Sequence, residues 1–133
     1  MVKTNYIYAA GKKRESSARV RLFKGKGTNT VNGIDVSDYF PGKVMKVLWE
    51  KPLGLIEASD KYYFSARIVG GGKMGQLGAL VHGLARAISK TSADKFRAPI
   101  KKAGLLTRDP RTRQRRMVGK GGKSRRAKQS PKR

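Results

Sequence analysis

Alternating apolar and polar residues in the first half of the chain are typical of half-buried β-strands. The alternation is clear around Arg19 and Arg21, where both arginines fall on one face of the strand and the apolar residues fall on the other. Asn32-Gly33 lies between β-favouring residues and predicts a two-residue hairpin, whereas Gly11-Lys12-Lys13-Arg14 predicts a basic turn. The predicted strands are residues 5–10, 18–23, 53–58 and 62–69.

Helical spacing begins after Pro41-Gly42 and predicts a first, short helix. Val44, Val47 and Leu48 form its apolar stripe and are expected to be buried. The helix is expected to end before Pro52, because a proline disfavours helical backbone in the residue that precedes it.

The strongest helical pattern extends from residue 73 to about residue 90. Gly78 and Gly83 inside it each cost about 1 kcal/mol relative to alanine, so they predict close packing against the sheet. One face of this helix carries three polar residues, His82, Arg86 and Lys90. The face expected to be buried carries Leu77, Leu80, Val81, Leu84 and Ile88.

A last helical turn is predicted from Pro99 to Gly104, after which the apolar periodicity ends. The sequence therefore predicts a globular domain over residues 1–104 and an extended basic tail over residues 105–133. The domain is expected to be α+β, with a four- or five-stranded sheet covered by helices.

Charge indicates the kind of partner. The chain has 32 Lys and Arg against 8 Asp and Glu, a formal net charge of +24, and residues 111–133 contain 11 of the basic residues and none of the acidic ones. A tail this polar buries too little apolar surface to offset the conformational entropy lost on ordering, unless a polyanion neutralises its charge. Nucleic acid is favoured over anionic lipid, because no helix combines a basic face with a face of Trp, Phe and Leu.

Composition also excludes several kinds of site. The chain has no Cys, so thiolate metal sites and disulfides are excluded, and the single His82 cannot form an imidazole cluster. No metal and no cofactor are expected. Neither a signal peptide nor a bilayer-spanning run is expected, which predicts a cytoplasmic protein with no membrane partner.

One motif would suit an enzyme. Gly70-Gly71-Gly72-Lys73-Met74-Gly75 satisfies G-x-G-x-x-G between a predicted strand and a predicted helix. However, no strand follows that helix, and Asp94, at a suitable distance to hold a ribose, lies in a polar turn. The chain is therefore expected not to be an enzyme and to have no small-molecule substrate. The glycine-rich turn could still receive an RNA phosphate at the helix N-terminus.

Basic residues form the candidate binding surface. Arg19 and Arg21 share a strand face close to the basic turn, and arginine pairs in the tail can bind phosphates bidentately. The predicted nucleic-acid-binding residues are Lys12, Lys13, Arg14, Arg19, Arg21, Lys73, Arg86, Arg108, Arg111, Arg113, Arg115, Arg116, Lys120, Lys123, Arg125, Arg126 and Lys128.

Several runs of residues carry a family resemblance over nearly the whole length of the chain. They are Gly11-Lys12-Lys13-Arg14, Ala18-Arg19-Val20-Arg21, Val31-Asn32-Gly33, Asp38-Tyr39-Phe40, Gly70-Gly71-Gly72 with Gly75-Gln76, His82-Gly83-Leu84-Ala85-Arg86-Ala87, and Lys102-Ala103-Gly104-Leu105-Leu106-Thr107-Arg108-Asp109-Pro110-Arg111. With these runs the chain resembles the family of the ninth protein of the small ribosomal subunit, in its bacterial form.

The resemblance implies a mixed sheet with covering helices and a left-handed βαβ crossover, like the second domain of the fifth protein of that subunit. It implies that the basic residues above bind rRNA in the subunit head, beside neighbouring head proteins. It also implies that the tail threads through rRNA until Lys132 and Arg133 contact P-site tRNA. The family usually ends in Ser-Lys-Arg, whereas here Pro131 separates Ser130 from the basic pair.

A structural protein of the small subunit is the main hypothesis. An architectural protein that compacts DNA or RNA is the first alternative, and a nucleotide-dependent enzyme built on the Gly70 loop is the second. Sedimentation with the small subunit would separate the first two, and nucleotide binding by the purified protein would be needed for the third.

Overall fold

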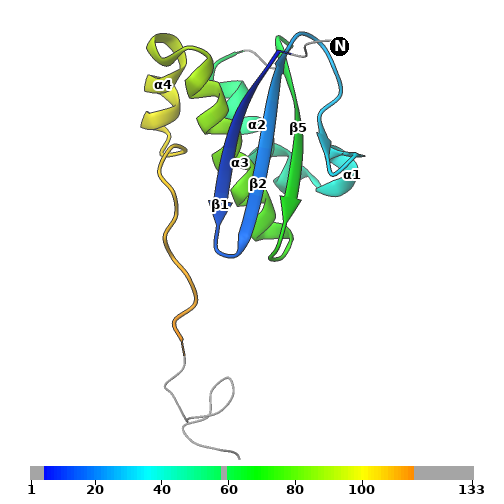
Figure 1. The fold of residues 1–133 in the computed structure, drawn as a ribbon, viewed down its shortest axis with the longest axis vertical. Coiled ribbons are helices and arrows are strands. Elements are labelled where there is room, and N and C mark those ends of the chain that lie inside the picture. The colour runs from blue at the N-terminus through cyan, green and yellow to red at the C-terminus, as the bar shows by residue number, and fades with distance from the viewer. Residues whose placement is uncertain (1–4, 58–59, 116–133) are drawn as a thin grey trace, which may run out of the picture.

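The computed structural model describes residues 5–57 and 60–115 and confirms the α+β class. A five-stranded mixed sheet has the strand order β1-β2-β5-β3-β4. In Figure 1, α2 and α3 lie behind β1, β2 and β5, and α4 lies beside them. The elements in chain order are β1 (Tyr6–Lys13), β2 (Ser16–Lys24), β3 (Thr30–Val31), β4 (Ile34–Asp35), α1 (Val36–Tyr39), α2 (Lys43–Leu55), β5 (Tyr62–Val69), α3 (Lys73–Thr91) and α4 (Ala93–Lys102).

The sheet combines antiparallel and parallel pairs. β2 pairs antiparallel with both β1 and β5, while β3 pairs parallel with β5. The chain passes through α1 and α2 between β3 and β5, so these elements form a βαβ connection. This arrangement is compatible with the fold expected from the family resemblance.

The core lies between the helices and one face of β1, β2 and β5. Every second residue of β2 from Ala18 to Leu22 is buried, and so is every second residue of β5 from Phe64 to Ile68. The alternation follows from the strand period of two, which places successive side chains on opposite faces. Leu77, Leu80, Leu84 and Ile88 of α3 are buried against this face as predicted, whereas Val81 is only partly buried.

The glycine of α3 nearest the sheet allows helix and strand backbones to meet. A Cβ at Gly83 would lie 2.8 Å from Val20 Cγ2 and 3.2 Å from the backbone nitrogen of Gly11. A Cβ at Gly11 would in turn collide with the backbone of Ala79 and Gly83. The predicted close packing of this helix against the sheet is therefore confirmed at Gly83.

The prediction for the short helix that begins after Pro41-Gly42 is wrong in its end and in its buried face. α2 continues through Pro52 to Leu55, so the predicted strand over residues 53–58 does not form in its described part. Val44, Val47 and Leu48, expected to be buried, are 73%, 66% and 37% exposed, and the buried residues of the helix are Trp49, Pro52 and Leu53. α2 has two apolar stripes, and the one that is buried contains its largest side chain, Trp49, packed edge-on against Phe64.

Two other boundaries also differ from the prediction. Gly11, Lys12 and Lys13 belong to β1, and the turn that follows is centred on Arg14, whose φ is 53°. Pro99 lies inside α4 rather than at its start. α3 ends at Thr91, Ser92 has an extended backbone, and α4 begins at Ala93. The hairpin at Asn32-Gly33 is confirmed, with φ values of 54° and 82°.

Candidate nucleic-acid interface

The face of the sheet away from α2 and α3 is basic. Arg19 and Arg21 are exposed on this face, as predicted, and Arg67 of β5 lies directly opposite Arg19 in the strand register. β1, β2 and β5 contain no Asp or Glu. Sequence analysis missed Arg67, although it alternates with Ala66 and Ile68 just as Arg19 and Arg21 alternate with buried residues.

A second basic region lies where three distant segments meet. A groove of about 980 Å³ is lined by the β1–β2 turn, the first turn of α3 and the beginning of the tail. It brings together four predicted binding residues, Arg14, Lys73, Arg111 and Arg113, with Glu15 as its one carboxylate. The N-cap of α3, Gly72, offers no side-chain acceptor, so this end of the helix adds positive partial charge to the groove.

The glycine loop before α3 serves chain packing. Gly70 and Gly71 have φ values of 79° and 66°, a conformation that favours glycine. A Cβ at Gly71 would collide with the Ser16 hydroxyl, and that hydroxyl donates to the Gly70 carbonyl at 3.0 Å. α3 is followed by α4, and Asp94 lies in the first turn of α4. In the described residues, therefore, the loop lacks the second strand and the acidic residue of a dinucleotide site.

Lys73 is held against α1. Its Nζ donates to the Tyr39 carbonyl at 3.1 Å and lies 3.6 Å from the centre of the Tyr39 ring. The Tyr39 hydroxyl donates in turn to Oε1 of Gln76 at 2.7 Å. These contacts fix the ammonium at the edge of the groove, where it contributes charge from a defined position.

The predicted polar face of α3 lies along the outer edge of β1. Arg86 donates to the Ala10 carbonyl at 2.6 Å, and Lys90 donates to the Tyr8 carbonyl at 3.0 Å. The Lys12 backbone N–H donates to Nδ1 of His82 at 3.4 Å. Three side chains thus satisfy backbone groups that an edge strand otherwise leaves open to pairing with another chain.

His82 also connects this edge to the tail. Burial lowers the pKa of His82, a hydrogen bond with the Leu106 backbone raises it, and the nearby charges of Arg86 and Arg108 lower it, with a net decrease. The imidazole is therefore held neutral, in the form that can accept the Lys12 N–H. His82 thus links the edge of β1 to the Leu106 backbone at the start of the tail.

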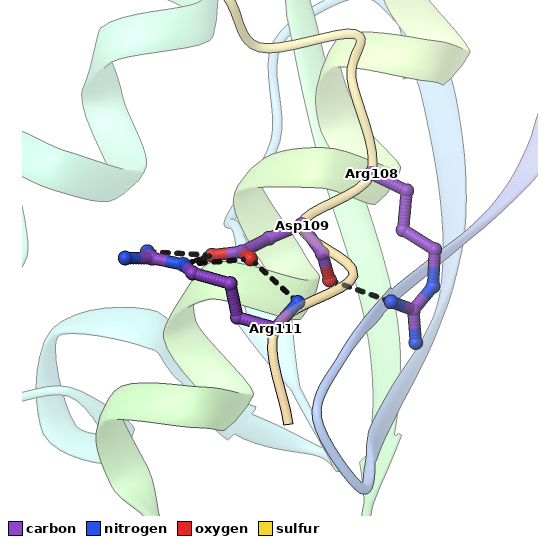
Figure 2. Close-up of polar contacts among 3 residues, drawn as sticks. All are labelled: Arg108, Asp109 and Arg111. Atoms are coloured by element: carbon purple, nitrogen blue, oxygen red, sulfur yellow. Dashed lines mark hydrogen bonds and ion pairs between the residues drawn. The ribbon is translucent and has the colours of Figure 1, made fainter. Parts of the chain in front are cut away.

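The tail begins with a turn stabilised by Asp109 (Figure 2). The Asp109 carboxylate accepts bonds from the Arg111 backbone N–H at 3.0 Å and from its guanidinium at 2.8 to 3.3 Å. These bonds hold the pKa of Asp109 well below its usual range. Arg108 donates to the Asp109 carbonyl at 2.6 Å, and Figure 2 shows Arg108 and Arg111 extending in opposite directions.

A cluster of basic residues on α3 and α4 completes the surface. Arg86, Lys90 and Arg97 line a pocket of about 280 Å³ together with Ser89 and Leu106. Lys90 and Arg97 were both absent from the predicted binding set, and Arg97 lies in α4 upstream of the helical turn predicted from Pro99.

Of the other predicted binding residues, Arg115 is exposed at the end of the described tail. Eight predicted rRNA- or tRNA-binding residues lie outside the described residues: Arg116, Lys120, Lys123, Arg125, Arg126, Lys128, Lys132 and Arg133. Within the described part of the chain, no group of three or more His, Asp or Glu could hold a metal ion. No helix there is long and apolar enough to cross a membrane.

Fold and surface together define a small α+β protein with a basic sheet face that no described helix covers and a basic groove where its tail begins. A family model described as ribosomal protein S9/S16 matches residues 11–133, and the chain belongs to this family. It is therefore a structural constituent of the small ribosomal subunit rather than a catalyst.

Proposed function

We propose that the domain binds rRNA in the head of the small subunit and stabilises its fold by neutralising closely spaced phosphates. The observation that carries this proposal is the groove in which Arg14, Lys73, Arg111 and Arg113 converge from three segments. These four cations outnumber the two carboxylates beside them, Glu15 in the groove and Asp109 paired with Arg111, so the groove keeps a positive charge that attracts an anion. A phosphate backbone supplies such anions at regular spacing, and guanidinium groups bind them bidentately.

The proposal extends to the predicted domain and tail. Residues 1–104 would form the rRNA-binding domain, and residues 105–133 would continue along rRNA beside neighbouring head proteins. The turn at Asp109 supports this division, because it directs the chain away from α4 into the basic groove. Lys132 and Arg133, outside the described residues, would then reach P-site tRNA, as the family resemblance implies.

Salt dependence of binding to a head rRNA fragment tests the proposal. If about ten phosphates are neutralised, the logarithm of affinity should fall with the logarithm of salt concentration at a slope of about −7 to −9. Deleting residues 112–133 should flatten this slope markedly. A slope that the deletion leaves unchanged would show that the tail does not contact phosphates.

A charge-matched pair of variants tests the groove itself. Arg14→Gln combined with Arg111→Gln should weaken binding and reduce the slope by about two. Lys46→Gln combined with Lys51→Gln removes two exposed charges from α2, where Lys46 pairs with Glu50 at 3.9 Å, and should leave binding unchanged. Equal effects of the groove and α2 variants would refute an rRNA site in the groove.

The architectural alternative predicts a different distribution in cells. A protein that compacts DNA would sediment with chromosomal DNA, whereas this chain should sediment with small subunits on a sucrose gradient. Membership of the ribosomal family favours the second outcome.

A further inference from the structure

The sheet face that no described helix covers carries aromatic side chains as well as arginines. In the register of β1, β2 and β5, Tyr6 lies opposite Phe23, and Phe23 lies opposite Tyr63. The next row on the same face contains Tyr8, Arg21 and Ser65. The row after that contains Ala10, Arg19 and Arg67. Aromatic residues thus occupy one end of the face and arginines its middle.

The aromatic rings form a continuous, ordered surface. The rings of Phe23 and Tyr63 stack with centroids 5.0 Å apart, and Tyr6 lies 5.7 Å from Phe23 at an angle of 56°. The Arg21 guanidinium lies 5.2 Å from the centre of the Tyr6 ring. Packing on both sides therefore holds Tyr6 in place, as a surface that stacks with a ligand requires.

The two tyrosines of β1 remain available to a partner. Tyr6 and Tyr8 are 44% and 46% exposed, whereas Ala9, which follows Tyr8 and faces the core, is 1% exposed. Figure 1 shows no described helix in front of these three strands. Tyr63 is different, because a Cβ at Gly27 would lie 2.8 Å from its ring atoms, so the loop before β3 covers it. The accessible stacking groups are therefore Tyr6 and Tyr8.

Charge selects the partner that fits this face. Arg19, Arg21 and Arg67 lie within one or two rows of the tyrosines, and the three strands contain no acidic residue. An anion that also presents flat π-surfaces satisfies both features. Bases inside a duplex are stacked on each other and present only their edges, so the partner must have unpaired bases.

We propose that Tyr6 and Tyr8 stack on unpaired bases of rRNA while Arg19, Arg21 and Arg67 bind the adjoining phosphates. This inference rests on the proposed rRNA-binding function and names the kind of rRNA element that the sheet face takes, a single-stranded loop or bulge. The basic groove, in contrast, needs only phosphates and would serve duplex and single strand alike.

The test compares the full chain on two probes, a single-stranded oligouridine and an RNA hairpin duplex with the same number of phosphates. Tyr6→Leu with Tyr8→Leu keeps apolar side chains and charge but removes both rings. We expect this variant to bind oligouridine at least tenfold more weakly, with the salt slope and the hairpin affinity unchanged. Val47→Ala, an exposed apolar residue on α2, is the control and should alter neither affinity.

Two further measurements separate the explanations. Unaltered thermal unfolding of the tyrosine variant excludes a folding defect, and ultraviolet crosslinking of uridine to the wild type should modify Tyr6 or Tyr8. If Arg14→Gln with Arg111→Gln weakens binding but the tyrosine variant does not, and crosslinks avoid β1, the stacking inference is wrong while the rRNA function stands. If neither variant changes affinity for either probe, the proposed function itself fails. Weakened capture of a protein from the small subunit, with RNA affinity intact, would show instead that the face docks a protein.

Discussion

Three glycine-to-alanine substitutions in helices test the packing of α3 on the sheet. Each gains about 0.5 to 1 kcal/mol from helix propensity, so any difference among them reports the surroundings of the new methyl group. At Gly83 the methyl would lie 2.8 Å from Val20 Cγ2 and 3.2 Å from the Gly11 backbone nitrogen. Because the strand backbone cannot move aside, overpacking should cost about 1 to 3 kcal/mol. The expected net result for Gly83→Ala is a loss of up to about 2.5 kcal/mol.

Gly78 and Gly54 are the matched controls. The three atoms nearest a methyl at Gly78 all belong to the flexible Lys13 side chain, which can rotate away, and a methyl at Gly54 meets nothing within 4 Å. Gly78→Ala should therefore change stability by less than about 1 kcal/mol, and Gly54→Ala should raise it slightly. Urea unfolding followed by circular dichroism gives the three free energies of unfolding. If Gly83→Ala is as stable as Gly54→Ala, the close contact between α3 and β1 does not exist as described.

Three other outcomes are expected. Leu53→Ala should cost about 2 to 5 kcal/mol of unfolding free energy, while Val47→Ala should cost less than about 0.5 kcal/mol; similar losses would contradict the orientation of α2. Because the pKa of His82 is lowered in the folded state, the unfolded chain binds more protons, so stability should fall as pH decreases below about 6.5, and His82→Gln should weaken this dependence in unfolding curves. Removing Lys132 and Arg133 alone should leave subunit assembly intact but weaken the free energy of P-site tRNA binding by about 1 kcal/mol or less, which would appear as faster tRNA dissociation. Unaltered dissociation at low and high salt would refute the tRNA contact.

Local patterns predicted β1, β2, β5 and the long helix because one periodicity dominated each, whereas the strand predicted over residues 53–58 belongs to α2 in its described part. Val20 and Leu22 can face the core only in one register of β2, and the apolar stripe of α3 has no competitor. α2 differs, since its sequence offers two apolar stripes of similar width. The buried stripe is selected by the contact of Trp49 with Phe64 on the sheet. This is a tertiary contact between distant segments, so local periodicity alone does not reveal it.

The candidate site was predictable by residue type but not by arrangement. Arg14, Lys73 and Arg111 each stood out as basic residues, yet only folding brings the β1–β2 turn, the start of α3 and the tail to one groove. The role of the glycine loop was likewise decided by its partner, Ser16, which lies more than fifty residues earlier in the chain.

The polar face of α3 contacts the exposed edge of the sheet through side chains that are also basic. β1 is the edge strand, and its outward carbonyls at Tyr8 and Ala10 could pair with a second copy of the chain. Lys90 and Arg86 occupy those carbonyls, so the groups that block edge pairing are themselves cations. Each side chain keeps unused N–H donors after this bond, and Arg86 and Lys90 meet Arg97 at the next pocket. We therefore predict that Arg86→Leu both weakens binding to the rRNA fragment and promotes self-association of the free protein, which filter binding and analytical ultracentrifugation would measure; a change in only one of the two would show that Arg86 does not serve both roles.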